Sequence, residues 1–212
     1  YKRQPLRPVN ALAALESGVR RRIDVGRLNG GLFLNVAGTG FDAVVGAAFQ
    51  RAGQDGSRRG LLGYLRLSLA EVFRFRPRPL VLTSEGESRE LTPFIVTFAN
   101  GPQYGSGAII NPGGKLDDGR MEAVFFRYEG LGRVLAAAPR LFLGGLESAR
   151  GYGRASATGF TVTAESPLAI HRDGDPVESA SRIDVDLLPR ALDVVAPVAT
   201  IENPDGPFSR DS

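Results

Sequence analysis

The sequence predicts a mainly β (α+β) fold, an antiparallel β-sandwich with a few helices packed on its outside. Three observations lead to this prediction. Segments with strand periodicity outnumber helical segments and rarely alternate with them, which is typical of antiparallel sheets. The 27 glycines and 14 prolines indicate many turns. The 212 residues suit one domain, which we expect to span residues 1–202 and to end in a disordered polar tail, residues 203–212.

An early hairpin is the clearest local feature. Residues 22–28 alternate apolar and polar side chains, Asn29-Gly30 follows, and residues 32–37 return. Asn-Gly is the dipeptide most typical of two-residue hairpin turns, because both of its positions tolerate positive φ. Before the hairpin we expect a short helix at residues 9–17, which ends at a glycine.

Apolar spacing and turn residues predict the remaining elements. Apolar residues recur at helical spacing in residues 41–50, 61–73 and 131–143, and Pro77 and Pro79 end the second of these regions. The other expected segments are strands at residues 80–83, 91–99, 121–128, 156–164, 168–171, 182–187 and 191–195, with a Gly/Pro-rich loop at residues 100–114.

The charged residues are compatible with an anionic binding partner but do not require one. The net charge is only +3, but arginines gather at residues 20–22, at residues 58–59 and at the alternating positions Arg74, Arg76 and Arg78. Each group is suited either to phosphates and anionic lipid headgroups or simply to solvent. No helix-turn-helix, zinc-finger or RNA-binding aromatic motif accompanies the arginines in the sequence, so we expect no nucleic-acid binding.

The residues that would indicate secretion or membrane insertion are missing from this sequence. It contains no cysteine, which excludes disulfides and thiolate metal sites. No segment approaches ~18 consecutive apolar residues, the length of a membrane span. We therefore expect a cytoplasmic protein whose contact with a membrane, at the inner face, is peripheral.

One glycine motif suggests a nucleotide site. Residues 38–43 match the G-x-G-x-x-A form of the dinucleotide fingerprint and lie between a predicted strand and a predicted helix. The fingerprint also needs a second parallel strand that ends in an acidic residue ~20 positions later. Here a second helix follows instead, so a turn that needs glycine at Gly38 and Gly40 is the alternative explanation.

Two acidic turns carry the other candidate chemistry. In residues 115–120 two aspartates lie beside a glycine just before a strand, and Asp173-Gly174-Asp175 places two aspartates around a glycine. Carboxylates and turn carbonyls are ligands that magnesium prefers, and a carboxylate can also take a proton from a hydroxyl. Both segments equally suit ordinary β-turns. The single histidine, His171, suits a structural role better than acid–base chemistry.

Seven segments, taken in order, resemble the C-terminal part of the bacterial diacylglycerol kinase and related lipid kinase family. The likeness runs from about residue 9 to residue 197, and the segments are RRIDVGRLNG at residues 21–30, FLNVA at 33–37, GFDA at 40–43, GY at 63–64, ANGPQYG at 99–105, PGGKLDDG at 112–119 and RDGD at 172–175. The resemblance implies a β-sandwich that helps to form a lipid cleft. It also implies a separate N-terminal α/β domain whose Gly-Gly-Asp-Gly-Thr loop binds ATP, a loop that this sequence lacks.

The resemblance implies a magnesium site in residues 115–120. Asp118 corresponds to the family's metal-binding aspartate, and Lys115 and Arg120 lie at the positions that offer backbone carbonyls. Magnesium there would bridge toward the ATP-binding domain and stiffen the boundary between the domains.

The resemblance also implies catalytic roles for Asp175 and Asp173. Residues 173–175 resemble the family's Asp-Gly-Glu, whose final carboxylate is assigned as the proton acceptor for the lipid hydroxyl, and this role maps to Asp175. Asp173 would position the base or contact magnesium-bound phosphates. Aspartate is one methylene shorter than glutamate, and a base must come within ~3 Å of its proton, so either the cleft closes further or the role is weakened.

The expected function is therefore that of the lipid-binding, base- and metal-contributing domain of an ATP-dependent lipid kinase acting on a hydroxyl such as that of diacylglycerol. We expect the chain alone to be inactive. Its expected cofactors are Mg²⁺ and the co-substrate ATP, and its expected partners are its own N-terminal domain, a lipid and a second copy in a homodimer. Two alternatives stay open: a catalytically inactive lipid-binding or regulatory domain, and a dinucleotide-binding enzyme built on residues 38–43.

Overall fold

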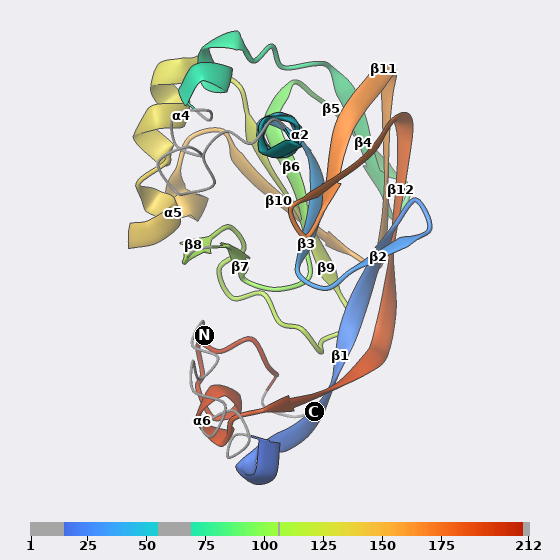
Figure 1. Cartoon of the computed structure of the whole chain (residues 1–212), viewed down its shortest axis with the longest axis vertical. Helices are drawn as coiled ribbons and strands as arrows, with labels where there is room; N and C mark the ends of the chain where they lie inside the picture. Colours follow the sequence, from blue (N-terminus) through green and yellow to red (C-terminus); the bar gives the residue numbers. More distant parts are fainter. Residues whose placement is uncertain (1–14, 55–68, 106, 210–212) are drawn as a thin grey trace.

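A large antiparallel sheet dominates the computed structural model, which describes residues 15–54, 69–105 and 107–209 (Figure 1). The strands of this sheet are β1 Val19–Leu28, β2 Gly31–Phe33, β3 Val36–Gly40, β4 Leu80–Ser84, β5 Glu87–Leu91, β6 Pro93–Ala99, β9 Met121–Arg127, β10 Tyr152–Ala157, β11 Gly159–Arg172 and β12 Asp175–Ala196. A small second sheet pairs β7 Gln103–Gly105 with β8 Ala108–Ile109. The helices are α2 Phe41–Gln54, α4 Leu131–Ala137, α5 Arg140–Leu143, the 3₁₀ turn η1 Leu146–Ser148 and α6 Val198–Ile201.

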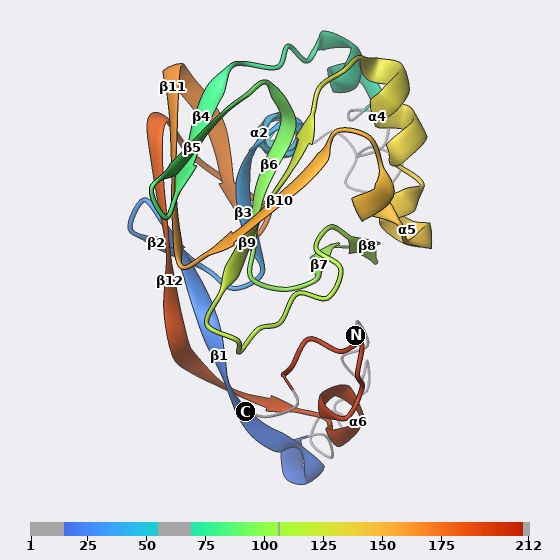
Figure 2. The ribbon, with the colours of Figure 1, turned by 180° about the vertical axis from the view of Figure 1, so that it is seen from behind.

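The sheet folds into two layers because β11 changes partners along its length. Its residues 161–163 pair with β4, its residues 170–172 pair with β3, and the register shifts between Thr163 and Leu168, where Pro167 interrupts the ladder. One layer is β10-β9-β6-β3, and the other contains β5, β4, β11, β12, β1 and β2 (Figure 2). The prediction of an antiparallel sandwich is confirmed.

The core between the layers is aliphatic and aromatic. Phe98 of β6 and Phe160 of β11 lie with ring centroids 5.5 Å apart, and both are almost completely buried. Each such side chain contributes about 1.5–3 kcal/mol by leaving water. The same cluster contains Leu28, Phe33, Leu82, Val96, Met121, Phe125, Val162, Ile170, Ile183 and Val185.

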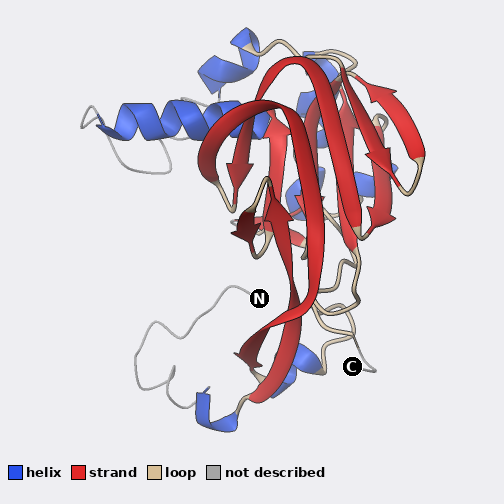
Figure 3. Cartoon of the chain, turned by 90° about the vertical axis from the view of Figure 1, so that its right-hand side faces the viewer, coloured by secondary structure: helices blue, strands red, loops and turns tan. Residues whose placement is uncertain are grey.

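Helices cover the outer face of the β6–β9–β10 layer, as predicted. Val134 of α4 and Leu141 of α5 pack on a second cluster that includes Phe94 and Phe126. The single helix expected at residues 131–143 is interrupted, because Pro139 has no N–H to donate and instead begins α5. α2 begins on the same cluster, where Phe41 stacks on Phe94 with ring centroids 4.7 Å apart, and then projects away from the sheets (Figure 3). Two further helices were expected at residues 9–17 and 61–73. Residues 15–17 and 69–74 are helical, and the other residues of these two predictions lie outside the described residues.

The Asn29-Gly30 hairpin is confirmed, but its return strand is shorter than expected. Asn29 and Gly30 have φ of 46° and 80°, as a two-residue turn of this kind requires. The predicted strand at residues 32–37 divides into β2 and β3 at residues 34–35. The physical reason is that the carboxylate of Asp173 accepts hydrogen bonds from the N–H groups of residues 34 and 35, which are then not available to a strand partner.

Residues 203–209, the described part of the tail expected at residues 203–212, pack against the rest of the structure. β1 and β12 continue beyond the sandwich as a two-stranded ribbon, and α6 follows (Figure 1). Phe208 is 5% exposed and packs with Ile23 and Leu116, so residues 203–209 form part of a third apolar cluster. Among the described helices none has both the length and the apolar character needed to cross a bilayer.

Candidate functional site

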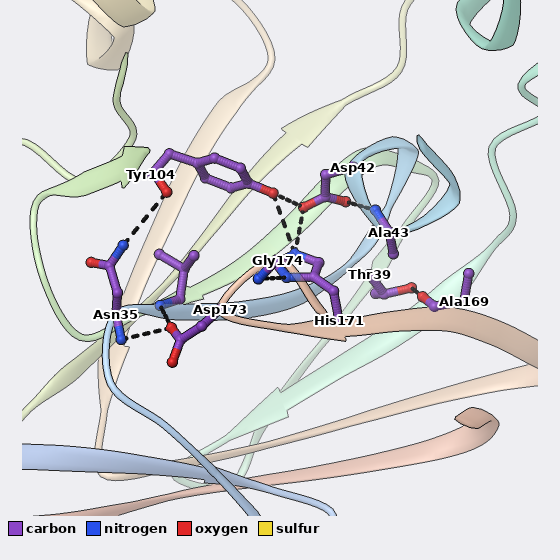
Figure 4. A network of polar contacts seen from close by, with 10 residues as sticks. Asn35, Thr39, Asp42, Ala43, Tyr104, Ala169, His171, Asp173 and Gly174 are labelled. Atoms are coloured by element: carbon purple, nitrogen blue, oxygen red, sulfur yellow. Dashed lines mark hydrogen bonds and ion pairs between the residues drawn. The ribbon is translucent and has the colours of Figure 1, made fainter. Parts of the chain in front are cut away.

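The Asp173-Gly174 turn joins β11 to β12 and is fixed by its first carboxylate. The two residues have φ of 48° and 93°, and Arg172 pairs with Asp175 across the turn. The backbone N–H of Leu34 donates to Asp173 Oδ2 at 2.7 Å. Those of Asn35 and Val36 donate to Oδ1 at 2.9 and 3.0 Å, and Figure 4 shows Asn35 beside Asp173. Asp173 therefore anchors the turn to the connection between β2 and β3.

Asp175 begins β12 with its side chain exposed. Within the described residues its carboxylate makes no hydrogen bond or ion pair, whereas the carboxylate of Asp173 is filled by three N–H groups. The turn thus holds one aspartate as a structural anchor and presents the other to solvent, where a ligand can reach it.

A hydrogen-bond network of Asp42, Tyr104 and His171 supports this turn. His171 is 2% exposed, and its Nε2 lies 2.9 Å from Asp42 Oδ2 at the start of α2. The Tyr104 hydroxyl donates to the same oxygen, and the N–H of Gly174 faces His171 Nδ1 at 3.4 Å (Figure 4). The network therefore joins α2, β7 and the turn that carries Asp175.

The charges of Asp42 and His171 stabilise each other. Burial lowers the pKa of His171, but the charge and hydrogen bond of Asp42 outweigh burial, so the pKa lies above its usual value of 6.5. Burial raises the pKa of Asp42, but His171 and Tyr104 outweigh it, and the net result is a lowered pKa. The contact from Gly174 requires an unprotonated Nδ1, so it belongs to the neutral imidazole.

We expect the folded chain to lose stability as the pH rises through the pKa of His171. A raised pKa in the folded state stabilises the fold fully below ~6.5, and this contribution disappears as the pH passes the folded value. His171 is the single histidine, so one ring proton resonance in NMR reports its titration. Melting temperatures of wild type should fall between pH 6 and pH 8 relative to those of His171→Gln. A His171 midpoint below 6.5 would contradict this expectation.

The segment predicted to hold magnesium lies against residues 204–209. Lys115 Nζ donates to the carbonyl of Gly206 at 2.6 Å and to that of Pro204 at 3.3 Å. The Arg120 guanidinium bonds Glu85 at 3.2 Å. Both side chains are thus engaged with other parts of the protein.

Asp118 lies in an electrostatic environment that suits a cation. Its carboxylate is exposed, and Oδ1 accepts the N–H of Arg120 at 3.0 Å. Partial burial raises its pKa, and the negative charges of Glu122, Asp24 and Asp117 raise it further. A divalent cation would relieve this repulsion, so the residues fit magnesium. The described residues contain no group of three or more His, Cys, Asp or Glu side chains arranged to hold a metal, so backbone and water oxygens would complete the shell.

Asp24 and Asn100, which the sequence interpretation missed, connect the two turns. Asp24 is fully buried, and its carboxylate accepts the N–H of Gly119 at 2.8 Å. Asn100 is also fully buried, and its Nδ2 donates to the carbonyls of Asp24 at 2.8 Å and Leu34 at 3.0 Å. An aspartate in an apolar strand and an Asn-Gly after a buried strand were the signals in the sequence.

The glycine motif at residues 38–43 has a packing role. All strand pairs among the described residues are antiparallel, including those of β3 with β6 and β11, so β3 and α2 form no part of a parallel βαβ unit. A Cβ at Gly38 would lie 2.3 Å from the carbonyl oxygen of Val96, and Gly40 has φ of 123°. The dinucleotide hypothesis is therefore not supported.

Comparison with known proteins agrees with this architecture. Residues 35–196 match the family model described as the YegS C-terminal NAD kinase beta sandwich-like domain. A Pseudomonas aeruginosa protein described as "Probable lipid kinase YegS-like" is 29% identical over 210 residues, which are 92% of this chain and 63% of that protein. A Pseudomonas putida protein of the same description is 26% identical and covered to 57%.

A solved structure shares the fold. The crystal structure of a protein described as a diacylglycerol kinase from Bacillus anthracis str. Sterne matches 92% of this chain and 61% of its own, with 16% identity and a TM-score of 0.65. The chain thus spans about three fifths of the length of these relatives.

Proposed function

Since this chain belongs to the family of YegS C-terminal NAD kinase beta sandwich-like domains, we propose that it is the domain of an ATP-dependent lipid kinase that binds the lipid and contributes the base and a metal site. The observation that carries the proposal is the exposed Asp175 carboxylate on a turn that Asp173 and the His171 network hold in place. A fixed, accessible carboxylate is what a general base for a lipid hydroxyl requires.

In the proposed reaction Asp175 accepts the proton of the lipid hydroxyl as its oxygen attacks the γ-phosphorus of ATP. The bond from that phosphorus to the bridging β–γ oxygen breaks, and ADP leaves in line with the attacking oxygen. Asp173 acts as a positioning residue, because three N–H groups already occupy its carboxylate. The side chain of Asp175 is short, so the hydroxyl must approach closer to the turn than it would for glutamate.

Magnesium is proposed at Asp118 with the carbonyls of Lys115 and Arg120. It would supply positive charge at the boundary with an ATP-binding domain. Asp24 and Asn100 then link this position to the turn of Asp175 through hydrogen bonds of their buried side chains. Catalysis therefore belongs to the assembled pair of domains, and a lipid at the inner face of a membrane and a second copy of the chain are further proposed partners.

The test is an assay of the full-length protein with ATP and a panel of lipids: diacylglycerol, phosphatidylglycerol and sphingoid bases. We expect phosphoryl transfer to at least one lipid alcohol and none from this chain alone. The alternative, an inactive lipid-binding domain, is motivated by aspartate instead of glutamate at position 175. Lipid binding with no transfer to any member of the panel would favour that alternative.

A further inference from the structure

A cavity of about 440 Å³ lies between α2 and the segment that leads into β4. Its wall combines cationic and apolar side chains. The lining residues are Thr39, Gly40, Val44, Glu71, Arg74, Phe75, Arg76, Arg78, Leu80, Pro93, Pro167, Leu168, Ala169 and Ser179. None of them belongs to the two turns discussed above.

Three arginines lie close together in residues 74–78. Arg74 ends a helical segment, Arg76 and Arg78 follow it, and all three are exposed, whereas Phe75 and Pro77 between them are partly buried. All three arginines line the cavity. The spacing noted in the sequence thus places three guanidinium groups beside one hollow.

Neutral acceptors hold two of these arginines. Nη1 of Arg76 donates to the carbonyls of Phe73 and Phe75 at 3.3 and 3.2 Å. Nη1 of Arg78 donates to Ser166 Oγ and to the carbonyl of Pro167, both at 3.1 Å. Both guanidinium groups are therefore oriented without losing their positive charge, and their other N–H groups can bind an anion.

The charge of the third arginine, Arg74, is balanced by a carboxylate. Arg74 Nη1 lies 3.6 Å from Glu71 Oε1, and Glu71 is the only carboxylate among the described residues that line the cavity. The cavity lining therefore carries two net positive charges, from Arg76 and Arg78.

Another part of the cavity wall is apolar and closely packed. Phe75 packs edge-on against Phe41 at 5.7 Å and Phe94 at 5.4 Å, measured between ring centroids. Val44 and Leu168 complete this wall. A positive rim over a fixed apolar wall suits a ligand with an anionic group joined to a hydrocarbon chain.

The cavity is separate from the Asp175 turn. A side chain at Gly46 of α2 would contact the carbonyl of Gly174, and Asp42 binds His171, so these two positions face the turn. Val44 lies two residues from each, about 200° around the helix, and faces the cavity instead. Along β11, Ala169 lies four residues before Asp173, roughly 13 Å away.

We propose that this cavity binds the phosphate group of an anionic lipid, with Arg76 and Arg78 on the phosphate and the apolar wall against the acyl chain. A phosphate presents several oxygens to guanidinium N–H groups, which favours arginine over other cations. This inference requires no catalytic activity, so its failure would leave the proposed kinase function untouched.

Isothermal titration of this chain with three soluble probes tests the proposal. The probes are dihexanoyl phosphatidic acid below its micelle concentration, glycerol 3-phosphate and uncharged dihexanoylglycerol. We expect the lipid phosphate to bind at least about tenfold tighter than either other probe, because only it uses both walls. Arg76→Gln with Arg78→Gln should weaken its binding about tenfold or more.

Matched variants identify the place of binding. Arg22→Gln with Arg89→Gln removes the same charge from arginines that pair with Asp193 and Glu87, and it should leave the affinity unchanged. Val44→Trp should fill the cavity and block binding while all charges remain, provided circular dichroism shows a folded chain. Asp175→Ala should bind like wild type. The proposal is overturned if the two arginine pairs weaken binding equally, if glycerol 3-phosphate binds as tightly as the lipid, or if Asp175→Ala alone removes binding.

Discussion

Asp175→Ala in the full-length protein is expected to lower turnover about 10²–10⁴-fold, the usual contribution of a general base. The side chain is exposed and has no partner within the described residues, so the melting temperature and the affinity for lipid should change little. Steady-state kinetics with a short-chain lipid, together with thermal denaturation, separate these quantities. A loss in kcat at constant KM is the expected pattern.

Two controls sharpen this result. Asp175→Glu keeps the carboxylate and extends it by one methylene, so it should retain activity and raise turnover if the hydroxyl lies too far from the shorter side chain. Asp205→Ala removes another exposed carboxylate, near the end of the chain, and should have no effect. Near-normal turnover of Asp175→Ala would show that another group takes the proton.

Asp24→Ala is expected to lower the free energy of unfolding by about 3–5 kcal/mol. The Asp24 carboxylate is fully buried and accepts the N–H groups of Gly119 at 2.8 Å and Arg190 at 2.7 Å. Its removal leaves two backbone donors without an acceptor, each worth about 1–3 kcal/mol. Urea denaturation of this chain measures the loss.

Asp193→Ala is the matched control for Asp24. It lies on the same ribbon, where it pairs with Arg22 at 3.6 Å, and both side chains are about two thirds exposed. Exposed pairs of this kind contribute about 0–1 kcal/mol. If Asp24→Ala and Asp193→Ala unfold at the same urea concentration, the carboxylate of Asp24 does not stabilise the loop at Gly119.

Local chemistry predicted the turns well. Asn29-Gly30 and Asp173-Gly174 both adopt positive φ at two successive residues, a geometry that these dipeptides favour without help from the rest of the chain. The break between α4 and α5 at Pro139 could also have been predicted locally, since proline disrupts a helix interior. The division of the strand at residues 32–37 could not be predicted from a local rule, because it depends on the carboxylate of Asp173, which lies 137–139 positions later.

The candidate site was only partly visible in the sequence for the same reason. Asp173 and Asp175 were identified as a pair, but which of them is occupied by N–H groups depends on how β3 lies beside β11. Asp42 was hidden inside a nucleotide-like motif, and its partner His171 lies 129 positions away. The proposed roles of Lys115, Asp118 and Arg120 stay predictions.

The packing of residues 206–209 beside residues 115–117 determines when this region can fold during synthesis. Lys115 reaches the carbonyl of Gly206 across 91 positions, and the N–H of Ser209 donates to Asp117 Oδ1 at 2.7 Å across 92 positions. These contacts form only after residues 206–209 have left the ribosome, and closing such long loops costs entropy before any contact is gained. The segment proposed for magnesium is thus completed only after all twelve described strands of the two sheets have been synthesised.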